Sequence, residues 1–141
     1  MTPPGRFEIS QKLLVWREGR VLVLRDAASG QGDLPGGRLA TGELLAPWRD
    51  ALLREVREEL GARVEVGLEP EPRFAFPHRL PASGLPALGL MWVGRWLGGE
   101  PVLSDEHDDL VWAAPDERLP WLEGTLAEAA RRAIQLGPHT A

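Results

Sequence analysis

The chain has 141 residues, 43% of them hydrophobic and 26% charged, with no cysteine, so we expect one globular domain over residues 1–141 without disulfides. Its net charge of −5 gives no counterion-release affinity for a phosphate backbone, so we expect no long nucleic-acid partner. No apolar stretch approaches the ~20 residues of a membrane helix, and the first residues lack the features of a signal peptide; we therefore expect a cytoplasmic protein without a membrane partner.

The first predicted elements form a β-hairpin. Val15 and Trp16, then residues 21–24, are apolar β-forming residues on either side of Glu18-Gly19, which is the pattern of two strands joined by a turn. Residues 27–33 predict a small polar loop. The segment Leu34-Pro35-Gly36-Gly37 then predicts a tight closure, because glycine permits backbone angles that other residues resist.

The clearest helix is predicted from about Pro47 to Leu60. Proline suits the first helical turn, and Gly61 suits the position just past the end. Every fourth residue is apolar, which predicts one buried stripe; its members are Trp48, Leu52, Val56 and Leu60.

The rest of the chain predicts three more strands and a second helix. The strands are expected at 63–66, 88–97 and 110–112, and the helix at 125–136. Residues 70–86 contain five prolines and are predicted to be mostly loop or broken strand. Strands on both sides of a helix, with a helix last, indicate an α+β or mixed α/β sandwich.

Three glutamates of the first helix, Glu55, Glu58 and Glu59, fall within about a quarter of a turn beside the buried stripe. One interpretation is a solvated acidic face with Arg54 and Arg57 as partners, and the helix alone favours it. The other is a divalent-metal site, because Mg²⁺ prefers carboxylate oxygens.

The context of this helix favours the metal site. Gly37, five residues, Glu43, and later Arg54-Glu55-Val56-Arg57-Glu58-Glu59-Leu60-Gly61-Ala62 resemble the Nudix box, which is Gly, five residues, Glu, seven residues, then Arg-Glu-apolar-x-Glu-Glu-x-Gly-apolar. Seven fixed identities recur in order, and at ~7% usage per residue type a chance match at one placement has a probability of ~10⁻⁸.

The resemblance implies a fold and an activity. The fold is a mixed β-sheet between helices, and the activity is Mg²⁺-dependent hydrolysis of a pyrophosphate bond in a nucleoside diphosphate linked to another moiety, with Mn²⁺ able to substitute. By resemblance, the metal ligands are Gly37 through its carbonyl, Glu55, Glu58, Glu59 and Glu106. Glu59 or Glu106 acts as general base, and Glu58 assists in catalysis. The expected partner is a small nucleotide, and a homodimer is possible.

One departure from the family pattern concerns the box itself. Ten residues separate Glu43 from Arg54 where the family has seven. The insertion lies in residues 44–53, so the glutamate triplet keeps its spacing. Glu43, Arg54 and Gly61 are the structural residues of the box, and the insertion leaves open whether Glu43 reaches Arg54.

Residues 105–109, Asp105-Glu106-His107-Asp108-Asp109, form a second acidic cluster. Taken alone it predicts an exposed loop. By resemblance, a loop ahead of a strand such as 110–112 carries an extra glutamate for metal binding or proton transfer, and Glu106 is the first candidate. His107 is predicted to be a surface histidine, since Mg²⁺ prefers oxygen.

Four residues outside the box are candidates for substrate binding. Arg25 ends the second predicted strand, where the family often has a basic residue that touches phosphate. His78 and Arg79 could flank a nucleobase together with Phe76, although phenylalanines at alternate positions favour a place in the core.

Two alternatives to hydrolysis share the fold. Isopentenyl diphosphate isomerases resemble longer chains with a catalytic cysteine, which this sequence lacks. A non-catalytic nucleotide sensor usually loses box glutamates, and none is lost here. The substrate is left open among nucleoside triphosphates, dinucleoside polyphosphates, ADP-ribose and capped RNA ends.

Overall fold

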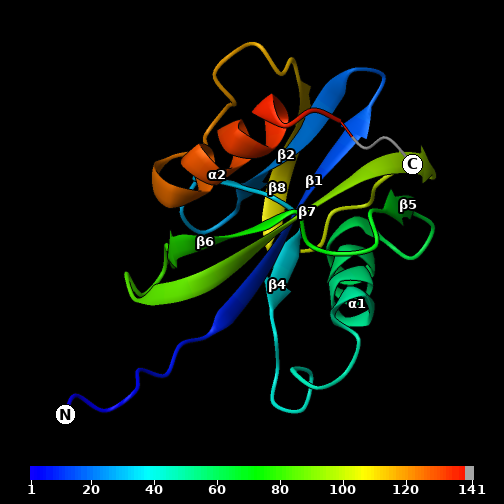
Figure 1. Ribbon diagram of the computed structural model, residues 1–141. Coiled ribbons are helices and arrows are strands. Elements are labelled where there is room, and N and C mark those ends of the chain that lie inside the picture. Colours follow the sequence, from blue (N-terminus) through cyan, green and yellow to red (C-terminus); the bar gives the residue numbers. More distant parts are fainter. Residues whose placement is uncertain (139–141) are drawn as a thin grey trace.

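The computed structural model describes residues 1–138, within which eight strands form one sheet accompanied by two helices. In chain order the elements are β1 (Ile9–Arg17), β2 (Arg20–Asp26), β3 (Gly32–Asp33), β4 (Gly36–Arg38), α1 (Trp48–Leu60), β5 (Glu65–Leu68), β6 (Phe74–Arg79), β7 (Pro86–Gly98), β8 (His107–Ala113) and α2 (Gly124–Gln135). Figure 1 shows the sheet running between α1 and α2.

The two long strands β1 and β7 form the centre of the sheet. They run parallel, and residues 9–16 of β1 pair with residues 88–95 of β7. On its other edge β1 has two partners in succession, since Ser10 to Lys12 pair with β4 whereas Trp16 and Arg17 pair with β2. The strands β3 and β8 extend the sheet beyond β2, so the sheet divides at the middle of β1.

The helices cover opposite faces because successive strand residues point to opposite sides of a sheet. Leu13 and Val15 of β1 pack in the core beneath α1, together with Leu52 and Val56 of that helix. Leu14, between them, packs in the core beneath α2. The predicted α+β sandwich with a mixed sheet between helices is therefore confirmed. Neither helix within residues 1–138 is long and apolar enough to cross a membrane.

Most predicted elements are present, with shifted bounds. The hairpin turns at Glu18-Gly19 as predicted, but β1 begins at Ile9, well before the predicted start. Helix α1 begins at Trp48, with Pro47 as its extended N-cap rather than within its first turn. The short strands β3 and β4 occupy residues 32–33 and 36–38, which were predicted as loop and turn.

The proline-rich segment 70–86, predicted to be mostly loop or broken strand, contains one short strand. Residues 74–79 form β6, which pairs with β7 along six registered positions despite Pro77. Among the described elements β6 pairs with β7 alone, so β6 is an edge strand. Proline is tolerated there because the outer edge of such a strand makes no backbone hydrogen bonds to a further strand.

Candidate active site

Helix α1 carries three glutamates in three different environments. Glu59 is 3% exposed, Glu55 is half-buried and Glu58 is exposed. The difference arises because the apolar stripe of the helix faces the sheet and position 59 borders that stripe. The same helix therefore presents one carboxylate to the interior and another to solvent.

The glycines of β4 bring the backbone close to this helix. A Cβ atom on Gly37 would lie 2.6 Å from the carboxyl carbon of Glu55, so a larger residue would displace the carboxylate. Gly36 has a φ of 140°, and a Cβ there would overlap the carbonyl oxygen of Gln11. Both positions thus require glycine for close approach.

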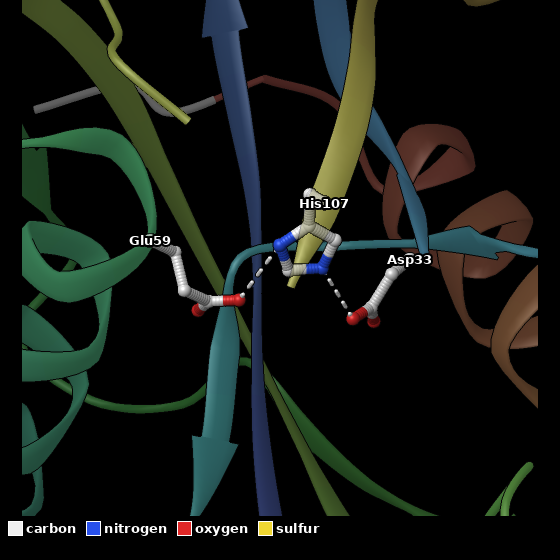
Figure 2. A group of neighbouring side chains, drawn as sticks. All are labelled: Asp33, Glu59 and His107. Atoms are coloured by element: carbon white, nitrogen blue, oxygen red, sulfur yellow. Dashed lines mark hydrogen bonds and ion pairs between the residues drawn. The ribbon is translucent and has the colours of Figure 1, made fainter. Parts of the chain in front are cut away.

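The carboxylate of Glu59 has a neighbour on each side. The N–H of Gly36 donates to its Oε1 at 2.8 Å, and His107 Nδ1 lies 3.6 Å from its Oε2. The other nitrogen of the imidazole, Nε2, lies 3.1 Å from Oδ2 of Asp33. Figure 2 shows the ring between the two carboxylates, with Glu59 extending from α1 and Asp33 from the opposite side.

Asp33 connects this histidine to a buried lysine. Its Oδ1 accepts from Lys12 Nζ at 2.8 Å and from the N–H of Leu34 at 2.8 Å. Lys12 is only 9% exposed, so its ammonium group requires a paired carboxylate. We call Lys12, Asp33, His107 and Glu59 the buried network.

Burial and charge shift the protonation of this network. Burial raises the pKa of Glu59 to about 7. Burial opposes ionisation of Asp33 as well, but the charge of Lys12 and the hydrogen bond from His107 outweigh it and lower the pKa of Asp33 to about 2. The pKa of His107 is raised despite its burial, through the hydrogen bond to Asp33 and the charge of Glu59. Asp33 is therefore ionised at neutral pH.

Asp33, Glu59 and His107 also bring one potential metal-ligand atom each within 4.8 Å of one another. The ammonium of Lys12 already supplies a positive charge 2.8 Å from Asp33, and His107 uses Nε2 for the same carboxylate. A second cation bound between Asp33 and His107 would be repelled by Lys12. Lys12, Asp33 and His107 are therefore joined by hydrogen bonds, and Glu59 lies beside them with its Oε2 3.6 Å from His107 Nδ1.

The loop before β8 brings Glu106 to the same region. Its carbonyl accepts from the N–H of Ala27 at 2.9 Å, and the N–H of Ser104 donates to the carbonyl of Glu59 at 3.2 Å. Burial is the main cause that raises the pKa of Glu55, and the charge of Glu106 adds to it. The exposed carboxylate of Glu106 thus acts on the half-buried one of Glu55.

A cavity of about 440 Å³ lies on the α2 side of the sheet, and Asp33 of the buried network lines it. Gly37, Lys12 and Asp33 form part of its wall, and His78 and Leu126 form another part. The side chain of His78 is held by a 2.8 Å hydrogen bond between its Nδ1 and Thr125, and burial lowers its pKa. The cavity therefore offers a neutral imidazole beside a buried ion pair.

The other candidates for substrate binding lie outside the wall of this cavity. Phe76 is 6% exposed and belongs to the core beneath α2. Arg79 donates to the carbonyl of Gly84 at 2.8 Å. Arg25 is paired with Asp108 at 2.7 Å and lies 5.2 Å from the ring of Trp121. Of the four candidates, the structure places His78 in the wall.

The NUDIX domain model matches residues 9–136. The chain belongs to the Nudix family. It is 32% identical to the CTP pyrophosphohydrolase of Escherichia coli (strain K12), over 84% of this chain and 91% of that protein. It is 34% identical to a MutT-like protein of Streptomyces ambofaciens, over 82% of this chain and 70% of that protein.

Solved structures of Nudix proteins have the same architecture. The MutT NUDIX hydrolase from Burkholderia pseudomallei is 26% identical, covers 91% of this chain and 98% of its own, and superposes with a TM-score of 0.72. The MutT protein from Methanosarcina mazei Go1 superposes with a TM-score of 0.77 at 22% identity, over 98% of this chain and 100% of its own, which concerns the fold alone.

The insertion in the Nudix box does not separate Glu43 from Arg54. Arg54 Nη2 lies 3.2 Å from both carboxylate oxygens of Glu43, while Nη1 lies 3.2 Å from Glu55 and 3.1 Å from Glu58. The extra residues lengthen the loop before Trp48, where α1 begins. The helix and the internal spacing of its glutamates are therefore unaffected, and Gly61 ends the helix with a φ of 99°.

The sequence interpretation missed the buried network and misplaced one of its members. His107, predicted to be a surface residue, is 4% exposed because β8 begins at this residue and turns its ring toward the interior. Asp33 was assigned to a loop. The available signal was Lys12, a charged residue directly before the apolar run of β1, since a lysine within a buried strand needs an acidic partner.

Proposed function

We propose that this Nudix protein hydrolyses a pyrophosphate bond in a nucleoside diphosphate linked to another group, in a reaction that depends on Mg²⁺ or Mn²⁺. The observation that carries the proposal is the position of the Glu55 carboxylate against Gly37 and of the Glu59 carboxylate against the N–H of Gly36, with Gly37 also lining the 440 Å³ cavity. The carboxylates supply the metal ligands, and the cavity is large enough for a nucleoside.

The chain offers an oxygen donor set for a hard cation. We assign as ligands Glu55, Glu58, Glu59, Glu106 and the carbonyl of Gly37, and such oxygen donors are those that Mg²⁺ prefers. When bound, the cation neutralises charge on the pyrophosphate and makes its phosphorus easier for water to attack. In this structure Arg54 contacts Glu55 and Glu58. When these two carboxylates bind the cation instead, Arg54 still has Glu43 as an ion-pair partner.

The remaining chemistry belongs to side chains of this protein. Glu59 or Glu106 accepts the proton of the attacking water as the new P–O bond forms. The P–O bond of the pyrophosphate linkage breaks, and its electron pair leaves with the departing phosphate. The products are a nucleoside monophosphate and the other phosphorylated half. His78 orients the nucleoside in the cavity, and Arg25 and Arg79 act at its periphery. Phe76, whose ring centroid lies 5.5 Å from that of His78, supports the imidazole from the core.

The first substrates to test are nucleoside triphosphates. A relative that is 32% identical is named as a CTP pyrophosphohydrolase, so CTP belongs in a panel with other triphosphates, a dinucleoside polyphosphate and ADP-ribose. We expect pyrophosphate or phosphomonoester release with Mg²⁺ or Mn²⁺ and little with Ca²⁺, whose larger and looser coordination shell holds phosphates differently. Full activity in EDTA would contradict the metal requirement.

The alternative is a Nudix module that binds nucleotide without cutting it. All three box glutamates of α1 are retained, which does not favour this alternative. Tight nucleotide binding by calorimetry, with no turnover of any member of the panel, would establish it in place of the hydrolase.

A further inference from the structure

The buried network runs through the sheet from one face to the other. Lys12 is on the face packed against α2, because Leu14, two residues further along β1, lies in that core. Glu59 comes from α1 on the opposite face. Asp33 and His107 join them where β1 changes partner from β4 to β2, so the division of the sheet leaves room for this connection.

Within the network, His107 is held on one side and free on the other. Its Nε2 is fixed by Asp33 at 3.1 Å, and Asp33 is itself held by Lys12 and by the N–H of Leu34. Its Nδ1 is buried and has no hydrogen-bond partner among residues 1–138. The nearest charged oxygen on that side is Oε2 of Glu59 at 3.6 Å, just beyond hydrogen-bonding distance.

We infer that His107 is a positioning residue for Glu59: Asp33 fixes the imidazole, and its Nδ1 confines the Glu59 carboxylate opposite the N–H of Gly36 (Figure 2). The inference rests on the proposed function in one respect, namely that Glu59 serves a cation or the attacking water. Side chains that lie behind a ligating group in this way set its orientation and its affinity for metal.

The role predicts a particular ranking of variants. Asparagine places an amide nitrogen near the position of Nδ1, whereas glutamine places one near Nε2. His107→Asn therefore keeps a contact toward Glu59 and loses the one to Asp33, and His107→Gln does the reverse. If His107 acts on Glu59, the asparagine variant retains more of the Mn²⁺ affinity than the glutamine variant does. If it only fills space, the two variants differ in stability alone.

The decisive experiment measures Mn²⁺ affinity of the substrate-free protein by electron paramagnetic resonance, together with melting temperature and steady-state kinetics. We expect His107→Gln to weaken Mn²⁺ binding by ~10-fold or more, the usual scale for a partner behind a metal ligand. His107→Asn should weaken Mn²⁺ binding less than His107→Gln does. The kcat values should follow the same order, while KM for nucleotide changes little. Glu59→Gln serves as the reference for a lost ligand.

Trp16→Phe is the matched control, because Trp16 Nε1 is the other buried nitrogen without a partner among the described residues. It should alter melting temperature without altering Mn²⁺ affinity. Wild-type Mn²⁺ affinity in His107→Gln, or equal losses in the asparagine and glutamine variants, would overturn the inference, as would an unchanged affinity in Glu59→Gln. If the ranking holds but no nucleotide is hydrolysed, the inference stands and the proposed function fails.

Discussion

Glu58 and Glu59 are neighbours in α1, yet their side chains are 57% and 4% exposed. Glu58 belongs to an exposed half of the site, where Arg54 contacts Glu43, Glu55 and Glu58. Glu59 belongs to the buried network, where each charged group has a fixed partner. In the exposed half, the ion pairs all involve Arg54 and are screened by solvent. In the buried half the side chains contact one another, so a substitution at one residue alters the position and charge of its neighbours.

The largest effect should come from the buried member of the pair. Glu59→Gln keeps an oxygen for the N–H of Gly36 but removes the ionisable carboxylate, so we expect kcat to fall by ~10³-fold. The exposed Glu58→Gln should lower kcat by ~10²-fold, at the lower end of the same range. Both variants should melt at or above the wild-type temperature without metal. A collapse of melting temperature would mean that these glutamates are structural partners.

The next effect tests the loop that faces α1. Glu106→Gln should lower kcat by ~10²-fold or more with little change in KM, as for a group that acts mainly in the transition state. Asp108→Asn is the control, because Asp108 is paired with Arg25 at the surface, and it should cost less than ~10-fold. The reverse ranking would mean that Asp108 is the functional acid of the loop.

A third prediction concerns the stability of the metal-free protein against pH. The pKa of Glu59 rises from 4.5 to about 7 in the fold. The contribution of Glu59 to the free energy of unfolding is therefore present below pH 4.5 and is lost as the pH rises through 7. The pKa of Asp33 falls from 3.8 to about 2. The contribution of Asp33 to the free energy of unfolding is therefore present above pH 3.8 and is lost as the pH falls through 2.

Chemical denaturation between pH 4.5 and 7 measures this dependence. The free energy of unfolding of the wild type should decrease with rising pH more steeply than that of Glu59→Gln, and Mg²⁺ should flatten the wild-type slope because it favours ionised Glu59. Parallel curves for the two proteins would show that burial does not oppose ionisation of this carboxyl.

The smallest effect should come from the cation of the exposed half. Arg54→Lys leaves one ammonium where a guanidinium contacts three carboxylates, and lysine cannot reproduce that fork. Because the ion pairs are exposed, the melting temperature should stay within about 2 °C. Turnover should fall by about tenfold or less, since Glu55 and Glu58 lose a common anchor. A loss as large as that of Glu59→Gln would contradict the division into two halves.

The sequence by itself determined the features whose causes are local. The four-residue spacing of Trp48 to Leu60 and the glycine after it determine α1, and helix geometry then places Glu55, Glu58 and Glu59 on one arc. The carboxylate site follows from a few turns of one helix, and for that reason the box pattern could be interpreted without a fold.

Only the tertiary structure decided how deeply each of these carboxylates is buried and what it contacts. Asp33 and His107 are 74 residues apart, and no periodicity relates a short strand to the first residue of β8. Their contact exists because β1 changes partner in mid-strand and β8 pairs with β2. The strand β6 depends likewise on its pairing with β7. Contacts between distant segments follow from how the sheet closes, and local sequence patterns do not encode that closure.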